Sequence, residues 1–134
     1  MRFSAEKSLK SLIDQSDKLE SKIANVFFFE NFVISEIKEG IHLTYEKSLP
    51  LINTALEYYD GNPFGYISNR IYSYSLDPTD YFKLERIENL KCFAVVSYDK
   101  ITSRNVSVER LFFGKPFKEF HELIKAVKWI KSIL

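Results

Sequence analysis

Apolar positions follow a period of two from Leu19 to Phe29 and end in an aromatic run, a pattern typical of a β-strand. A second strand is predicted from Phe32 to Lys38, so that the two meet near Asn31 as a hairpin. Glu39-Gly40 then indicates a turn before a short strand-like segment, residues 41–45. The folded part of the chain is therefore predicted to begin with an antiparallel pair.

Apolar residues spaced three and four apart predict helices over residues 49–59, 77–89, 103–113 and 123–134. Pro50 lies in the first turn of the first helix, where its missing N–H costs nothing. Asp77 can cap the second helix ahead of Pro78. Glycine and proline after residues 59 and 113 end the first and third helices.

Strands are predicted between these helices, at residues 64–72, 91–98 and 117–120. The middle one holds the continuous apolar run Cys92 to Val96, as expected of a central strand covered on both faces. The last one is a short edge strand. Strands that alternate with helices predict an α/β fold with a mostly parallel sheet, to which the first strands add a hairpin edge.

Residues 1–17 are mostly polar, but Leu9, Leu12 and Ile13 have helical spacing, which predicts a short helix or a frayed extension. Residues 18–134 are predicted to form a single domain. No apolar run approaches the roughly 18 residues that cross a bilayer, and nothing at the N-terminus resembles a signal peptide. With a lone cysteine, Cys92, the default compartment is the cytoplasm.

Charge and composition exclude several classes of protein. Nineteen basic and eighteen acidic residues leave a net charge of +1, too little to attract a nucleic-acid backbone. Apolar residues make up 46% of the chain, which is typical of a globular protein and not of a disordered tail.

The segment from Ser68 to Asp80 is the candidate surface for a partner or ligand, because ligands of open α/β sheets bind beyond the carboxyl ends of the strands. It combines strand-end polar groups, aromatic rings and hydroxyls ahead of a helix. The candidate residues are Asn69, Arg70, Tyr72, Ser73, Tyr74, Ser75, Asp77, Thr79 and Asp80. In the alternative, purely structural interpretation, Arg70 pairs with Asp77 or Asp80, Asp77 is only a cap, and the tyrosines pack on the sheet.

Three hydroxyls of this segment, Ser73, Ser75 and Thr79, are candidates for phosphorylation. A phosphate would add almost two negative charges near a helix start and could reverse a docking preference.

No catalytic, metal or cofactor site is predicted. His42 and His121 lie far apart, in no spacing that brings two metal ligands together. Cys92 lies inside an apolar strand, where burial raises the pKa of a thiol. The four glycines form no phosphate-binding loop.

Twelve phenylalanines fit either ordinary core packing or the lining of a hydrophobic cavity. A ligand cavity of the usual kind would have a volume on the order of several hundred Å³.

Three stretches carry a family resemblance: Phe32-Val-Ile-Ser-Glu-Ile-Lys-Glu-Gly40, Tyr66-Ile-Ser-Asn-Arg-Ile-Tyr-Ser-Tyr-Ser-Leu-Asp-Pro78, and Phe112-Phe-Gly-Lys-Pro-Phe-Lys-Glu-Phe120. With the order of elements, they resemble the SpoIIAA-like branch of the STAS superfamily, also catalogued as STAS/SEC14-type domains. The resemblance implies a four- or five-stranded sheet with about four helices, mainly on one face. It also implies regulated protein–protein contact, in some members a small apolar or nucleotide ligand, and no enzyme activity.

In the anti-sigma antagonists of that superfamily, a kinase modifies a serine in an Asp-Ser-small-Gly motif after the third strand. The matching region here, Ser73 to Pro78, has neither the preceding Asp nor the Gly.

The leading hypothesis is a non-enzymatic STAS-type module whose 68–80 loop contacts a protein partner. The alternative is a domain that binds a small apolar or nucleotide ligand with this loop as its mouth. An apolar cavity beside Arg70 favours the ligand, whereas a solid core under an exposed aromatic patch favours the module. An open sheet edge at the hairpin leaves homodimerisation as a further prediction.

Overall fold

The structure is a computed structural model that describes residues 16–134. The helix or extension predicted over residues 1–17 lies outside the described residues except for its last two positions. In chain order the elements are β1 (Asp17–Glu20), β2 (Ala24–Phe28), β3 (Phe32–Ile37), β4 (His42–Leu43), α2 (Tyr45–Tyr59), β5 (Phe64–Asn69), β6 (Ser75–Leu76), η1 (Pro78–Asp80), α3 (Tyr81–Leu84), β7 (Leu90–Val96), α4 (Lys100–Glu109), η2 (Arg110–Phe112), β8 (Phe117–Phe120) and α5 (Leu123–Ile133).

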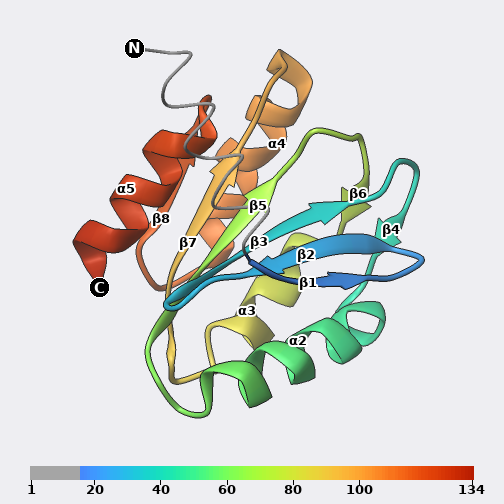
Figure 1. Cartoon of the computed structure of the whole chain (residues 1–134). Helices are drawn as coiled ribbons and strands as arrows, with labels where there is room; N and C mark the ends of the chain where they lie inside the picture. Colours follow the sequence, from blue (N-terminus) through green and yellow to red (C-terminus); the bar gives the residue numbers. More distant parts are fainter. Residues whose placement is uncertain (1–15) are drawn as a thin grey trace.

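The main sheet has the strand order β1-β2-β3-β5-β7-β8 (Figure 1). The pairs β1–β2 and β2–β3 are antiparallel, and the pairs from β3 to β8 are parallel. The mostly parallel α/β sheet with an N-terminal hairpin edge is therefore confirmed. It has six strands where four or five were expected, and β1 and β8 form its two edges.

The extra strand arises at Ser21, inside the segment predicted as one strand from residue 19 to 29. The Ser21 hydroxyl accepts hydrogen bonds from the backbone N–H groups of Ile23 and Ala24 and donates one to the Ala24 carbonyl. The chain reverses there, so that β1 folds back on β2 with Leu19 opposite Val26.

Helix α2 begins at Tyr45, four residues before its predicted start. Thr44 is its N-cap, and the Thr44 hydroxyl accepts a hydrogen bond from the Lys47 N–H at 3.1 Å. Pro50 therefore lies inside the helix and not in its first turn. The predicted end is correct, because Asp60 and Gly61 have positive φ angles of 46° and 81° that stop the helix.

The helix predicted over 77–89 is one 3₁₀ turn plus four residues of α-helix. Asp77 caps it as predicted, with its side chain accepting from the Thr79 N–H. After Leu84 the backbone forms successive turns instead, and Asn89 reaches the start of the central strand β5, where its carbonyl accepts from the Phe64 N–H.

The strand predicted over 64–72 ends at Asn69, where the chain leaves the main sheet. The following segment pairs with residues 40–43: Ser73 O accepts from the Gly40 N–H, and β4 and β6 form a small parallel sheet. This small sheet lies beside the carboxyl ends of β3 and β5 (Figure 1).

Side chains on the two faces of the main sheet form separate cores. On one face, β-strand residues such as Val33, Phe93 and Val95 pack with residues of α2, α3 and α4, including Tyr59, Tyr81 and Val106. On the other face, Ile34, Ile67 and Ala94 pack against α5 through Ala126, Val127 and Ile130. Three helices thus cover one face and α5 covers the other. Within residues 16–134, no helix is long and apolar enough to cross a membrane.

Candidate functional site

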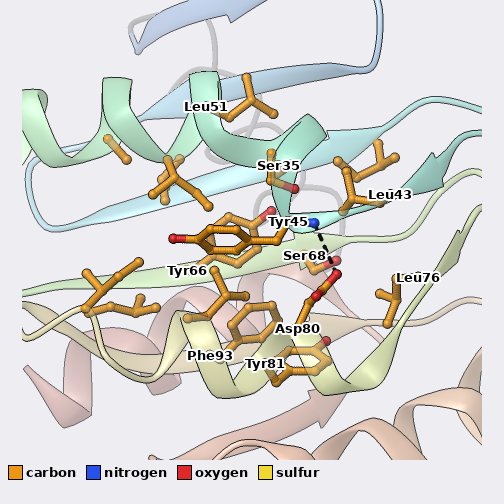
Figure 2. A pocket seen from close by; sticks show the side chains of 18 of the residues that line it. Ser35, Leu43, Tyr45, Leu51, Tyr66, Ser68, Leu76, Asp80, Tyr81 and Phe93 are labelled. Atoms are coloured by element: carbon orange, nitrogen blue, oxygen red, sulfur yellow. Dashed lines mark hydrogen bonds between the residues drawn. The ribbon is translucent and has the colours of Figure 1, made fainter.

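A cavity of about 110 Å³ lies between the main sheet and helices α2 and α3 (Figure 2). Its lining is mostly aliphatic and aromatic. It includes Val33 and Tyr66 from the sheet, Leu51 and Ala55 from α2, Leu84 from α3, and Leu43 and Leu76 from the small β4–β6 sheet. The cavity is smaller than the roughly 300–1,000 Å³ of pockets for drug-sized ligands. It approaches the roughly 150 Å³ of an engineered apolar cavity that binds benzene.

Helix α2 is held at its two ends, at one end by the sheet and at the other by η1, and the cavity lies between these contacts. At the C-terminal end, the buried Tyr59 donates from its hydroxyl to the carbonyls of Phe29 and Phe32 and stacks on Phe64 with ring centroids 4.4 Å apart. At the N-terminal end, the Tyr45 N–H donates to the Asp80 carboxylate at 3.1 Å. Between these points the apolar side chains of α2 that face the sheet are only half-buried.

Two serines lie side by side on the sheet face that forms the cavity floor. Ser35 on β3 and Ser68 on β5 are partners in the parallel register and are both about fully buried. Ser68 Oγ bonds to the Tyr74 hydroxyl at 3.0 Å and accepts from Arg70 Nε at 3.1 Å. Ser35 Oγ has no hydrogen-bond partner among the described residues.

Tyr66 lines the same cavity as Ser35, and the Ser35 hydroxyl influences the pKa of the Tyr66 phenol. Burial raises the pKa of Tyr66 well above its ordinary value, and the Ser35 hydroxyl counters this only in part. No hydrogen bond of normal geometry joins the two residues. The floor of the cavity therefore offers a neutral phenol and a serine hydroxyl whose hydrogen-bonding capacity is not used.

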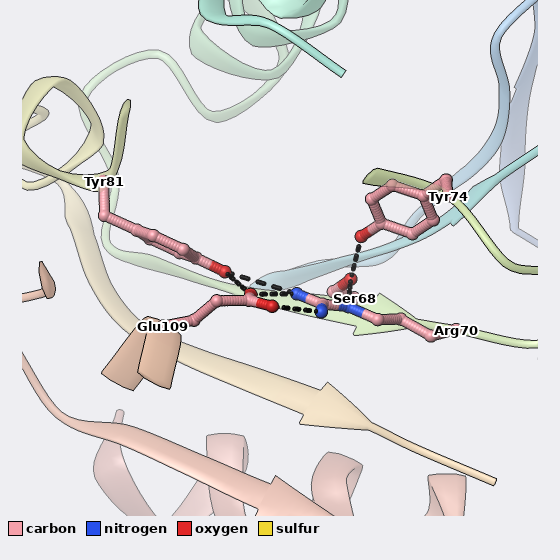
Figure 3. Close-up of polar contacts among 5 residues, drawn as sticks. All are labelled: Ser68, Arg70, Tyr74, Tyr81 and Glu109. Atoms are coloured by element: carbon pink, nitrogen blue, oxygen red, sulfur yellow. Dashed lines mark hydrogen bonds and ion pairs between the residues drawn. The ribbon is translucent and has the colours of Figure 1, made fainter. Parts of the chain in front are cut away.

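Arg70 forms a buried ion pair with Glu109 of α4 (Figure 3). Arg70 Nη1 and Nη2 donate to the two Glu109 oxygens at 2.7 and 2.5 Å, and the Tyr81 hydroxyl donates to Glu109 Oε1 at 2.6 Å. The side chains of Arg70 and Glu109 are 6% and 4% exposed. The alternative interpretation was right that Arg70 pairs with an acidic residue but wrong about the partner, which is Glu109 of α4 and not Asp77 or Asp80.

Tyr74 closes this cluster from the other side. Its ring lies against the Arg70 guanidinium, with Cζ 5.3 Å from the ring centroid, and its hydroxyl meets Ser68. Burial raises the pKa of both Tyr74 and Tyr81, so that both phenols remain neutral beside the Arg70–Glu109 ion pair. The positive charge of Arg70 at the end of the cavity is therefore matched by Glu109.

The structure brings Arg70 and Tyr74 to the cavity and places Asn69 elsewhere. Asn69 points to the α5 face, because neighbouring residues of a strand alternate between faces. There its amide donates to Glu36 at 3.1 Å and accepts from the Tyr98 hydroxyl at 2.6 Å. Burial raises the pKa of Glu36.

Five other candidate residues are exposed: Tyr72, Ser73, Ser75, Asp77 and Thr79. Ser75 Oγ bonds to His42 Nδ1 at 2.7 Å, and the Thr79 hydroxyl donates to Asp77. Asp80 is half-buried at the cavity, where it holds the start of α2. The three hydroxyls proposed for phosphorylation are thus at the surface, and Thr79 is bonded within the cap.

A groove of about 250 Å³ separates the 70–78 loop from α4, with Tyr72, Pro78, Asn105 and Val108 on its walls. Arg70 and Glu109 also line this groove. On α4 and η2, Ile101 and Leu111 are 72% and 78% exposed.

The remaining chemically reactive residues lie outside the cavity. Cys92 is buried on the α5 face, and burial raises its pKa to about 11. His121 is bonded to Ser97 near the start of α5. Within residues 16–134, no group of three or more His, Cys, Asp or Glu side chains gathers as a metal site would require.

The order and pairing of the strands can be compared with known proteins. No protein-family model and no curated protein matches the chain. Among solved structures, it is similar to an uncharacterised protein of the DUF3478 family, with a SpoIIAA-like fold, from Shewanella loihica. The TM-score is 0.53 over 86% of this chain and 91% of that one, at 18% identity.

The chain has a SpoIIAA-like fold. This confirms the fold class, and it confirms the SpoIIAA-like fold that the resemblance of the three sequence stretches implied. An identity of 18% carries the fold alone, so the chemistry of the site rests on this chain's own residues.

Sequence reasoning missed Ser35, Tyr66 and Glu109. Ser35 interrupts the apolar run Phe32 to Ile37 on its buried face, which is the signal that could have found it. Glu109 gave no such signal, because its position among polar residues of α4 is typical of a solvated helix face.

Proposed function

We propose that the protein is a non-enzymatic, STAS-type domain that binds a small, mostly apolar molecule between α2 and the sheet. The observation that carries the proposal is the apolar cavity with the unpartnered Ser35 hydroxyl on its floor. A buried hydroxyl without a partner costs free energy, and native proteins tolerate such groups mainly where they have a use. The cavity also meets the condition set for the ligand hypothesis, since Arg70 lines it.

The small volume limits the ligand to a molecule of about one ring or a short chain, unless α2 moves outward. The half-buried apolar residues of α2 support this binding site, because a ligand beneath the helix would complete their contacts.

A blocking variant tests the proposal. Ala55→Met places a flexible side chain in the cavity, and Asn53→Met places the same side chain on the exposed face of α2 as a matched control. Each of the three proteins would be purified from the cells that express it. The small molecules that it retains would be identified by native mass spectrometry and solvent extraction. We expect a molecule retained by the wild type and by Asn53→Met and absent from Ala55→Met. Equal retention by all three proteins, or none by the wild type, would count against this function.

A second candidate function is contact with a protein partner through the outer face of α4. Ile101, Val108 and Leu111 are exposed there beside Lys100 and Arg104, neither of which forms an ion pair within residues 16–134. Exposed apolar residues flanked by uncompensated positive charge favour an acidic, amphipathic partner segment.

This second candidate moves the proposed contact from the 68–80 loop to α4, because Arg70 and Tyr74 pack inside the molecule. Capture of partner proteins with the wild-type protein and with the double variant Ile101→Ser/Leu111→Ser tests this contact. An acidic partner retained only by the wild type is the expected result. A partner retained equally by both proteins would place the contact elsewhere.

A further inference from the structure

The polar groups of the cavity restrict the chemistry of the ligand. Ser35 lies on the floor, is 1% exposed, and has a hydroxyl that points into the cavity without a partner (Figure 2). Its register partner Ser68 is engaged by Arg70 and Tyr74. A ligand therefore meets an unused hydroxyl at Ser35, beside the neutral phenol of Tyr66, on this floor.

Charge in the cavity disfavours an anion. The only cation in its lining, among residues 16–134, is Arg70, and Glu109 already matches that charge through two hydrogen bonds. Asp77 and Asp80 are the other charged residues of the lining, and both are acidic. A carboxylate or phosphate would be buried without a free counter-charge, which opposes its binding.

A cation has no partner on the floor either. Asp77 is occupied by the Thr79 backbone and hydroxyl, and Asp80 by the Tyr45 N–H and by Lys83 at 3.7 Å. Both acidic groups belong to the η1 segment, whereas Ser35 belongs to β3. A positive group placed at Ser35 would therefore lie among Val33, Tyr66 and aliphatic side chains.

We propose that the cavity selects small neutral molecules with an apolar body of about one aromatic ring and a hydroxyl or carbonyl oxygen that bonds to Ser35. This inference rests on the proposed ligand-binding function and adds the class of ligand. The oxygen accepts from or donates to the Ser35 hydroxyl, and Tyr66 lies beside it. The ring occupies the volume between Ala55, Leu84 and the sheet.

Four probes of similar size separate the alternatives: benzyl alcohol, toluene, benzoate and benzylamine. Each would be titrated at about pH 7 into the full chain, and binding followed by the backbone amide signals of the cavity strands and α2. We expect benzyl alcohol to bind about fivefold more tightly than toluene, as one added hydrogen bond predicts. Benzoate and benzylamine should bind at least tenfold more weakly than benzyl alcohol.

The Ser35→Ala variant connects this preference to one atom. It should bind toluene as the wild type does and lose the preference for benzyl alcohol, whereas Ser132→Ala on the exposed surface of α5 should keep it. Ser35→Cys preserves the shape with a weaker hydrogen bond and gives the same comparison if the alanine variant unfolds.

The outcomes distinguish the two proposals. Tightest binding by benzoate or benzylamine, equal binding of toluene and benzyl alcohol, or an unchanged preference in Ser35→Ala would overturn the inferred ligand class while the cavity still binds. If no probe shifts the signals of the cavity residues at millimolar concentration, the proposed binding function fails, and the inference fails with it.

Discussion

Ser35 and Ser68 are register partners on neighbouring parallel strands, yet only Ser68 is hydrogen-bonded. The difference arises from Arg70 and Tyr74, which reach Ser68 from the end of β5 and from the following loop. Nothing equivalent follows β3, because the chain turns away at Gly40 to form β4. The unequal pair leaves one buried hydroxyl on the cavity floor without a partner, and the proposed ligand would bond to it.

The two serines should respond oppositely to alanine. Ser35→Ala removes a buried hydroxyl without a partner, so we expect the free energy of unfolding to rise by about 1 kcal/mol. Ser68→Ala leaves Tyr74 and Arg70 Nε with one partner fewer and should lower it by about 1–2 kcal/mol. Urea denaturation of both variants is the measurement. A loss of stability in Ser35→Ala equal to that in Ser68→Ala would mean that the Ser35 hydroxyl is already satisfied, for instance by an ordered water.

The Arg70–Glu109 pair should act as one unit. Arg70→Met leaves the Glu109 carboxylate buried beside Tyr81 without its counter-charge, and we expect a loss of about 3–5 kcal/mol in the free energy of unfolding. The double variant Arg70→Met/Glu109→Leu removes both charges and should recover most of that loss. Chemical denaturation of the single and double variants measures the coupling. Additive losses would indicate that the two side chains stabilise the fold independently.

Local sequence patterns were sufficient for the mostly parallel sheet with its hairpin edge, the end of α2 and the cap at Asp77. They failed at Ser21, because this turn is stabilised by a serine hydroxyl and contains no glycine, proline or asparagine. They also failed for Arg70, whose partner Glu109 lies 39 positions later. Pairing at that separation depends on how α4 packs across the sheet, and helix or strand periodicity carries no information about it.

The cavity was beyond sequence reasoning for a similar reason. Leu51, Ala55 and Leu56 have the spacing of a helix face that packs on a sheet, whether or not space remains beneath it. The distance of α2 from the sheet is set by contacts at its two ends, Tyr59 with Phe64 and Tyr45 with Asp80. The half-buried state of the intervening residues becomes visible only in three dimensions.

The buried tyrosines should make the fold sensitive to alkaline pH. The pKa values of Tyr59, Tyr66, Tyr74 and Tyr81 are raised by burial above the ordinary value near 10. Above about pH 10 the unfolded chain loses these protons while the folded chain keeps them, so the free energy of unfolding falls as pH rises. Below that pH these groups contribute no pH dependence. Urea midpoints measured from pH 8 to 11 should show this decline.

Substitution identifies one of the groups responsible. Tyr66→Phe removes a buried hydroxyl with a raised pKa and should make the alkaline decline shallower. Tyr72→Phe, on the exposed loop, is the matched control and should leave the decline unchanged. Identical pH profiles for wild type and Tyr66→Phe would show that Tyr66 ionises without penalty in the folded protein.

Gly65 fixes how closely α5 approaches the sheet on the face opposite the cavity. A Cβ at this position would lie 2.6 Å from Ile130 Cγ2, 2.8 Å from Ile130 Cδ1 and 3.0 Å from Cys92 Sγ. All three atoms belong to the packed α5 core, so Gly65→Ala should lower the free energy of unfolding by about 1–3 kcal/mol. Adding Ile130→Val removes one of the clashing carbons and should recover part of the loss.

Gly114→Ala is the control for this prediction. Its Cβ would meet only the flexible carboxylate end of Glu85, at 2.9 Å, so the free energy of unfolding should change little. Thermal unfolding of the three variants decides the matter, since equal losses for Gly65→Ala and Gly114→Ala would mean that α5 can move away from the sheet without cost.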